Sequence, residues 1–257
     1  MKSIIIKGTI CLEDDYHFLY KIAKIEYEEY EDGNYKYSIF PNFAVIDLLP
    51  VKVFQGIPGL DLSLRREVYK RENMIPVFIS ERAPANNREN LWELLEENNM
   101  TTNNMLEWLI KTNTRYSGDR LFVTNFKENN IYNVISMYEL VNRSNNIIKK
   151  LLQIITSGEY LVSKEVEIND STRKMIYNLL MPIYISTCKL RKKQQRKGIK
   201  EAQVNNKYKG RKKKELDTLL FSKLKEDYIN HKITAHNAAK RLGISRSTFI
   251  RRINCIK

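Results

Sequence analysis

The chain has 257 residues, of which 42% are hydrophobic, so it can bury one large core or two to three smaller ones. No apolar run approaches the roughly 18 residues of a membrane span, and the opening MKSIIIKGTICLEDDYHF makes a poor signal peptide. The cysteines, Cys11, Cys188 and Cys255, are odd in number and far apart, and they form no metal-ligand spacing with the histidines. We expect a reduced, cytoplasmic protein with no metal, no other cofactor and no membrane partner.

The charge is divided unevenly along the chain, whose formal net charge is +14. Residues 1–188 carry 22 basic and 25 acidic side chains, a net charge of −3, whereas residues 189–257 carry 22 basic and 5 acidic ones, a net charge of +17. Such a segment favours a polyanion as partner. We expect nucleic acid rather than a membrane surface, because the segment lacks the bulky apolar face that an interfacial helix buries.

The first 60 residues are typical of β-structure. Two runs rich in tyrosine and isoleucine flank Asp32-Gly33-Asn34, which is a strong hairpin turn. A connection rich in proline and glycine follows, and the apolar run MIPVFIS at 74–80 is predicted to be a short buried strand.

The middle of the chain alternates helical and strand patterns. Leucine spacing predicts helices over 87–99 and 103–112, GDRLFVTNF predicts a buried strand over 118–126, and NVISMYELVNR at 133–143 returns to helical spacing. This alternation favours an α/β arrangement of a layered sheet and helices.

A long helix is predicted over 169–206. Asp170, Ser171 or Thr172 would cap it, and Pro182 would kink it. One apolar stripe consists of Ile176, Leu179, Ile183, Thr187 and Leu190. Beyond Leu190 basic residues replace the stripe, as in a helix that leaves the protein body or in a surface helix with a solvated end.

The last segment predicts two helices joined by a tight turn, TAHNAAKRLGISRSTFIRRI at 234–253. Thr234 and Ser245 would cap the two helices, and Gly243 would supply the left-handed conformation between them. With LDTLLFSKLKEDYIN upstream as a further helix, this is the helix-turn-helix pattern of DNA-binding domains. The side chains predicted to face DNA are Ser245, Arg246, Ser247, Thr248, Arg251 and Arg252. A protein-docking three-helix unit is the alternative.

The run KYKGRKKK at 207–214 precedes these helices. A solvated charge run, a localisation signal and a DNA-binding arm are the three interpretations. We favour the arm, in which Lys207, Tyr208, Lys209, Gly210, Arg211 and Lys212 would contact DNA, with the arginine deep in a minor groove.

The strings QQRKGIKEAQVNNKYKGRKKK and AAKRLGISRSTFIRRI together resemble the C-terminal part of serine recombinases of the resolvase/invertase family. The matching arm residues are Gly198, Ile199, Ala202, Tyr208, Gly210 and Arg211, and Gly243 to Thr248 match the recognition turn. Upstream, GDRLFV at 118–123 and YLVSKEVEINDSTRKMIYNLL resemble a strand of the family and the start of its long dimer-forming helix. The resemblance implies double-stranded DNA as partner and a homodimer through the 171–200 helix.

The catalytic motifs of that family are not matched. Its nucleophile lies in a YxRxS strand, and the nearest string here is VFISER, where Ser80 and Arg82 are the nearest candidates in inverted order. The family's DRLxR motif is replaced by NFKENNI, which has no arginine. Because phosphoryl transfer depends on positioned positive charge and an aligned nucleophile, we expect no strand-transfer activity.

The resulting fold class is α/β, with a resolvase-like layered sheet and helices, an N-terminal β-rich extension, a long helix and a C-terminal all-α helix-turn-helix domain. The expected divisions are a 1–73 extension, a 74–168 resolvase-like region, a 169–206 dimerisation helix, a 207–214 arm and a 215–257 DNA-binding domain. The favoured function is site-specific DNA binding. An active, divergent recombinase on a mobile element and a DNA-anchored regulator with an unrelated N-terminal domain remain alternatives.

Overall fold

The computed structural model describes residues 4–116, 118–141, 147–205, 207 and 216–254. The chain forms two compact units, Met1–Lys192 and Lys193–Lys257, here called the first and the second unit. Each unit has its own hydrophobic core. Within the described ranges, no helix combines the length and the apolarity that crossing a membrane requires.

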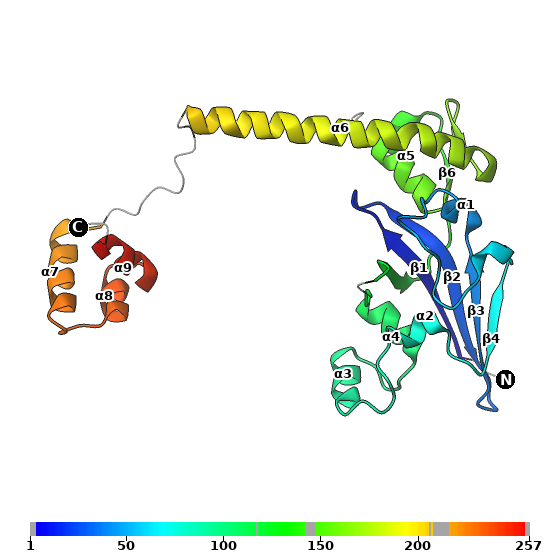
Figure 1. Ribbon diagram of the computed structural model, residues 1–257, viewed down its shortest axis with the longest axis horizontal. Coiled ribbons are helices and arrows are strands. Elements are labelled where there is room, and N and C mark those ends of the chain that lie inside the picture. Colours follow the sequence, from blue (N-terminus) through cyan, green and yellow to red (C-terminus); the bar gives the residue numbers. More distant parts are fainter. Residues whose placement is uncertain (1–3, 117, 142–146, 206, 208–215, 255–257) are drawn as a thin grey trace. The chain divides into compact units, whose positions relative to one another are not determined.

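A five-stranded sheet forms the centre of the first unit (Figure 1). Its order is β4-β3-β2-β1-β5, and every neighbouring pair is antiparallel. The strands are β1 Ile4–Glu13, β2 Leu19–Glu29, β3 Tyr35–Pro41, β4 Tyr69–Glu72 and β5 Leu121–Asn125. The predicted hairpin is confirmed, since Glu29 pairs with Tyr35 and Gly33 takes a φ of +79° in the turn.

This sheet overturns the expected boundary at residue 73. Strand β5 pairs with β1 from Gly8 to Leu12, so the β-rich segment and the 74–168 region share one sheet and one core. The alternation of strand and helix led us to expect a layered α/β arrangement. Four of the five strands instead come from the first 72 residues and lie antiparallel. Short turns over 14–18 and 30–34 join the first three strands, as antiparallel pairing allows, and the longer segment 42–68 leads to the fourth.

The helices of the first unit confirm two predictions and correct two. Helices α3 Leu91–Glu97 and α4 Met105–Thr112 lie where leucine spacing placed them. The run 74–80 is not a strand: Val77–Ser80 form the short helix α2 after Pro76, whose φ of −58° suits a helix start. Periodicity cannot separate a buried strand from a buried helical turn in so short a run. In 133–143 the described part holds the end of a strand at Asn133 and the 3₁₀ turn Met137–Leu140 in place of the predicted helix.

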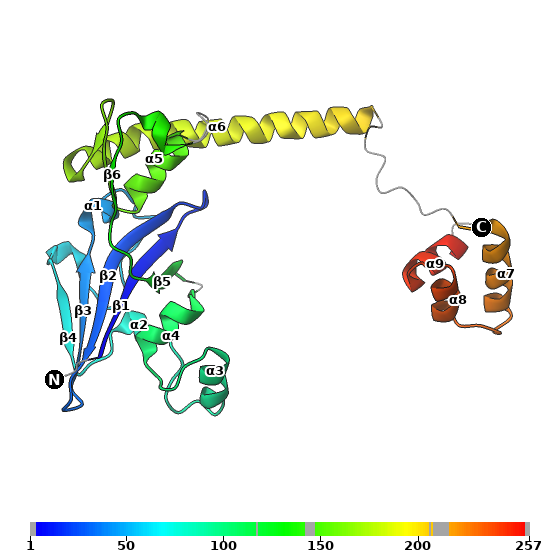
Figure 2. The same ribbon diagram turned by 180° about the vertical axis from the view of Figure 1, so that it is seen from behind.

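Two further helices, a second sheet and the first part of α6, Asp170–Val204, complete the described part of the first unit. Helix α1 is Phe43–Ile46, and α5 is Ile147–Thr156. The second sheet has the order β6-β7-β8, with β6 Ile131–Asn133 parallel to β7 Tyr160–Val162 and β7 antiparallel to β8 Glu167–Ile168. Figures 1 and 2 show α5 and α6 at one end of the five-stranded sheet and α3 toward the other end.

The predicted long helix is α6, Asp170–Val204, which continues through Pro182. Its cap differs from the expectation: Asn169 Oδ1 accepts hydrogen bonds from the backbone nitrogens of Ser171 and Thr172, at 3.1 and 3.0 Å. Arg173, Tyr177 and Met181 are its buried residues. The expected apolar stripe therefore lies mostly on the other side, where Leu179, Ile183 and Leu190 are exposed.

Besides the end of α6, the described part of the second unit contains three helices, α7 Thr218–Ile229, α8 Ala235–Arg241 and α9 Arg246–Asn254. Their apolar sides meet in a core of Phe221, Leu224, Ala235, Ala238, Ala239, Leu242 and Phe249. Phe249 is fully buried and makes edge-to-face contacts with Phe221 and Tyr228, at 5.9 and 5.7 Å between ring centroids. Alanines on α8 leave room for this close packing.

Candidate nucleic-acid interface

The turn between α8 and α9 has a defined hydrogen-bond pattern. Gly243 has a φ of +61°. Its N–H donates to Lys240 O at 3.1 Å, and the N–H of Ile244 donates to Ala239 O at 3.0 Å. This pair of bonds is the Schellman motif, which satisfies the last carbonyls of a helix and needs a left-handed residue, best supplied by glycine. The turn residue was predicted correctly from the sequence.

The start of α9 is held by hydroxyl groups. Ser245 Oγ accepts a hydrogen bond from the backbone N–H of Thr248 at 3.2 Å, which confirms the predicted cap. The same oxygen lies 3.0 Å from Ser247 Oγ and 2.8 Å from Thr248 Oγ1. Three of the predicted contact residues therefore form one local cluster that also fixes the helix start. Thr234 caps α8 in the same way through the N–H of Asn237.

One face of α9 is open to solvent. A shallow depression is lined by Arg246, Ser247, Ile250, Arg251 and Asn254. These positions are spaced by three, four or one residues, so they follow a single stripe along the helix. Two of the predicted arginines, Arg246 and Arg251, are exposed on it, whereas Arg252 is half-buried and does not line it.

A second depression adjoins the first at Arg246. It is lined by the α7–α8 connection and the start of α8, through Tyr228, His231, Lys232, Ile233, Thr234, Ala235 and His236. The sequence interpretation did not include Lys232 or His236 among the contact residues. The sequence could have indicated these two residues, because the lysine lies just before α8 and the histidine lies in its first turn.

Charge is separated between the helices of this unit. Residues 216–254 contain eight basic side chains and three acidic ones, and the acids are Asp217, Glu226 and Asp227, all on α7 or its cap. Residues 235–254 contain no acidic residue. The surface formed by α8 and α9 is therefore positive, and it combines arginines with hydroxyl and amide groups.

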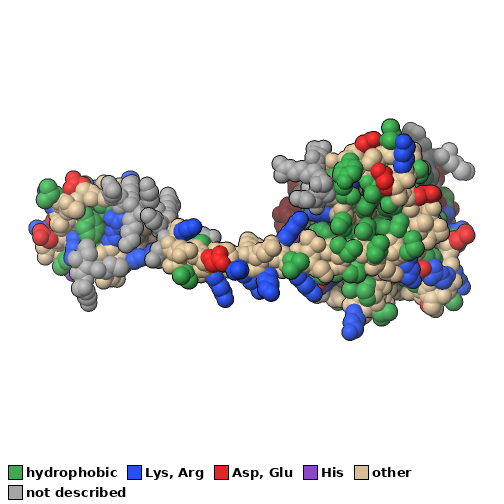
Figure 3. All heavy atoms as spheres, turned by 90° about the horizontal axis from the view of Figure 1, so that it is seen from above, with side chains coloured by type: hydrophobic (Ala, Val, Ile, Leu, Met, Phe, Trp, Pro, Cys, Tyr) green, Lys and Arg blue, Asp and Glu red, His purple; other side chains and the backbone are tan. Residues whose placement is uncertain are grey.

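Further basic residues lie on the last turns of α6 and beyond it. Residues 191–200 are all exposed, and Figure 3 shows lysine and arginine side chains projecting along this helical segment. Its ion pair joins Lys197 to Glu201 at 3.8 Å. Lys207 is exposed. The other predicted arm residues, Tyr208, Lys209, Gly210, Arg211 and Lys212, lie outside the described residues.

The two nearest catalytic candidates have structural partners. Ser80 ends α2, and its hydroxyl donates to Val77 O at 3.1 Å, its one hydrogen bond among the described residues. Arg82 is buried and bonds to Asp119 and to Phe78 O, and its guanidinium stacks 4.2 Å from the Phe78 ring centroid. Both terminal nitrogens of the guanidinium thus have partners, whereas Nε has none among the described residues, and Arg82 joins α2 to the segment before β5.

The described residues contain no cluster of three or more histidine, cysteine or acidic side chains that could hold a metal ion. No protein-family model matches the chain. No curated protein matches it either. The interpretation of the second unit therefore depends on its own residues and on the motif resemblance given above.

Proposed function

We propose that this protein binds duplex DNA through a C-terminal helix-turn-helix domain and carries out no strand transfer. The observation that carries the proposal is the open face of α9, where Arg246, Ser247 and Arg251 lie on one stripe in a pair of helices without an acidic residue. The Schellman turn at Gly243 and the Ser245 cap hold that face rigidly on a separate small core.

In the proposed complex, α9 enters the major groove and presents its first turns to the base edges. Arginine forms bidentate hydrogen bonds with guanine, and hydroxyl and amide groups reach bases or phosphates. Lys232 and His236, near the start of α8, would face the phosphate backbone. The basic residues of 191–200 and the 207–214 run would follow the adjacent backbone and minor groove, a geometry taken from the recombinase resemblance.

The experiment is a titration of fluorescent duplexes, selected from a random library, against the full chain at several salt concentrations. We expect affinity to fall steeply with salt, with a log–log slope of about −0.9 for each phosphate neutralised. Arg246→Gln and Arg251→Gln should each weaken binding to the selected site by about 1–3 kcal/mol and relax its sequence preference.

Lys223→Gln on α7 removes the same charge from the exposed surface of another helix and serves as the matched control. It should leave the sequence preference unchanged. Affinity that is insensitive to salt, or equal effects of all three substitutions on sequence preference, would contradict the proposal.

We also propose that two copies associate through α6. Met175, Leu179, Ile183 and Leu190 are large apolar residues exposed by 45–68% on this helix, and the first three are spaced by four residues. Burying such a stripe against a second copy is the usual outcome for an apolar helix face. Leu179→Glu should shift sedimentation toward the monomer, whereas Lys174→Glu, at an exposed polar position, should not.

The partners of Ser80 and Arg82 support the proposed absence of strand transfer, because both side chains make contacts within the fold. The test is incubation with supercoiled DNA that carries the selected site. We expect no relaxed or recombined product and no protein linked to DNA. A 5′-phosphoserine adduct on any serine-containing peptide would overturn this part of the proposal.

A DNA-anchored regulator with an unrelated N-terminal domain is the second candidate. One observation favours it: the first unit is organised around an antiparallel sheet whose first four strands precede the segment compared with recombinases. If residues 1–192 bind a ligand while residues 193–257 bind DNA, the result favours a DNA-anchored regulator over a recombinase that has lost its activity.

A further inference from the structure

A cavity of about 310 Å³ lies in the first unit. Its walls come from the β1–β2 turn, the segment after α1, Arg120 and the inner side of α6. The apolar lining residues are Leu49, Pro50, Val53, Met181, Pro182 and Ile185, together with the rings of Tyr16, Tyr20 and Tyr177. The volume lies at the lower end of the range for small-molecule sites, and the composition, mostly apolar with a few polar groups, is typical of them.

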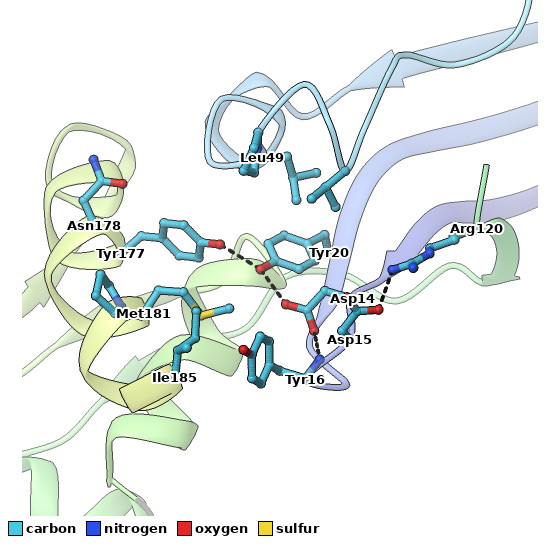
Figure 4. Close-up of a pocket in the computed structure, with 13 residues that line it drawn as sticks. Asp14, Asp15, Tyr16, Tyr20, Leu49, Arg120, Tyr177, Asn178, Met181 and Ile185 are labelled. Atoms are coloured by element: carbon cyan, nitrogen blue, oxygen red, sulfur yellow. Dashed lines mark hydrogen bonds and ion pairs between the residues drawn. The ribbon is translucent and has the colours of Figure 1, made fainter. Parts of the chain in front are cut away.

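The polar groups at this cavity are mainly acceptors. Asp14 Oδ1 accepts hydrogen bonds from the backbone nitrogens of Tyr16 and Phe18, and Oδ2 accepts one from Tyr20 Oη at 3.1 Å. Tyr177 Oη lies 2.9 Å from Tyr20 Oη, which completes the chain of groups shown in Figure 4. A carboxylate offers about four acceptor positions, so Asp14 has capacity for one more donor.

Tyr20 and Tyr177 keep their protons. Burial, the largest cause, raises the pKa of each phenol above its ordinary value, and Asp14 raises both further by its charge. Because the Tyr20 hydroxyl donates to Asp14, it is left to accept the hydrogen bond from the Tyr177 hydroxyl. Both phenol oxygens then retain lone pairs at the cavity, and neither supplies a negative charge.

Helix α6 adds a further hydrogen-bond acceptor, a backbone carbonyl that lacks its usual donor within the helix. Pro182 has no backbone N–H, so the carbonyl of Asn178, four residues earlier, lacks its intrahelical donor. Both residues line the cavity. At the rim, Asp15 is exposed and accepts a hydrogen bond from Arg120 Nη1 at 2.8 Å, so this guanidinium is paired with a carboxylate. With two carboxylates and one guanidinium, the lining has a net charge of −1.

We propose that this cavity binds a small organic cation that has an apolar body, such as an aromatic primary amine. The ammonium group would donate to the acceptors formed by Asp14, the Asn178 carbonyl and the tyrosine oxygens. The body would lie against the tyrosine rings and Met181, and aromatic faces attract a cation near them. This inference does not depend on DNA binding.

The experiment uses the full chain and three probes of one shape: 2-phenylethylammonium, neutral 2-phenylethanol and anionic 3-phenylpropanoate. Ligand-observed NMR titration measures their dissociation constants. We expect the amine to bind with a dissociation constant of about 1 mM or below, about three- to tenfold tighter than the alcohol, with no measurable binding of the carboxylate.

Two variants locate the site. Val53→Trp fills part of the cavity and should abolish amine binding. Asp15→Asn removes an exposed rim charge and should weaken it about two- to fivefold. Glu96→Gln on α3 removes an exposed acid outside the cavity and should leave binding unchanged. Melting temperatures of all variants show whether each is folded.

The proposal is overturned if the amine does not bind, or if the alcohol or the carboxylate binds as tightly as the amine. It is also overturned if folded Val53→Trp binds normally, or if Asp15→Asn and Glu96→Gln have equal effects. Asp15 is exposed, and its substitution removes a surface ion pair with Arg120 but no buried contact. Asp15→Asn should therefore fold, and it decides the matter even if the Val53 variant does not.

Discussion

Gly243 lies between α8 and α9 with a φ of +61°, whereas Gly198 lies inside α6 with no heavy atom within 4 Å of the position that a Cβ would take. The same substitution should therefore have opposite effects at the two sites. Gly243→Ala forces a left-handed alanine and should lower the stability of the second unit by about 1–2 kcal/mol. Gly198→Ala should stabilise α6 by about 1 kcal/mol.

Circular dichroism at 222 nm during thermal unfolding measures both changes. The two variants serve as controls for one another, because each adds one methyl group to a basic segment. A shift of the same sign in both would show that the backbone conformation at residue 243 is not what fixes the turn.

Cys11 predicts a particular response to alkaline pH. The side chain is buried, and desolvation raises its pKa from 9.0 to about 11. A raised thiol pKa contributes stability that is complete below the unfolded value and is lost as pH rises from about 9 to about 11. Between pH 8 and 10 the wild type should thus lose about 1.3 kcal/mol more unfolding free energy than Cys11→Ala.

Urea unfolding at the two pH values measures this difference. Tyrosine ionisation contributes to both proteins and cancels in the comparison. Cys188→Ala retains Cys11 and should lose as much stability as the wild type. Equal losses in the wild type and Cys11→Ala would show that the buried thiol does not resist ionisation.

At the scale of elements, one buried arginine joins α5 to α6. Arg173 is fully buried, and its guanidinium donates to Ile154 O at 3.3 Å, to Ile155 O at 2.9 Å and to Glu159 O at 2.9 Å. It therefore adds a donor to carbonyls at and just beyond the end of α5, two of which also accept from the backbone nitrogens of Glu159 and Gly158, at 3.1 and 3.3 Å. Burial lowers the pKa of this guanidinium from its ordinary value.

Arg173→Met should lower the unfolding free energy by about 2–4 kcal/mol, because it removes three hydrogen bonds made by a buried, charged donor. Lys174→Met, one residue further on the exposed side of α6, should change it by less than about 0.5 kcal/mol. Chemical denaturation measures both. A loss of similar size in both variants would mean that the bonds to α5 do not hold the helix in place.

The elements that the sequence predicted best have local causes. Asp32-Gly33-Asn34 requires a turn, and leucine spacing alone places α3 and α4. The elements it missed depend on distant partners. Helix α2 is a short run whose Phe78 and Ile79 are buried only through the rest of the fold, and β7 and β8 are short strands that pair with each other and with β6.

At the scale of the whole molecule, two separate cores predict two unfolding transitions. Phe249 and Leu152 are both fully buried, one in each core. Phe249→Ala should remove about 3–5 kcal/mol from the second unit, and Leu152→Ala about 2–5 kcal/mol from the first. Differential scanning calorimetry of the full chain should show each substitution shifting a different transition.

The unit cores also provide an internal control, since each substitution leaves the other core intact. If either substitution shifts both transitions together, the chain unfolds as one cooperative body. DNA titration of Leu152→Ala below its first transition then tests whether the DNA binding proposed for the second unit persists when the first unit is weakened.

The sequence by itself determined the charge division, the hairpin, the long helix and the capped turn around Gly243, because each depends on neighbours within a few residues. The tertiary structure decided which strands share a sheet, that Arg82 is directed to Asp119, and which side of α6 is buried. It also decided the cavity beside Tyr177, whose walls come from residues as far apart as 14 and 185. Such contacts join segments that no local pattern relates, so only packing of the complete chain specifies them.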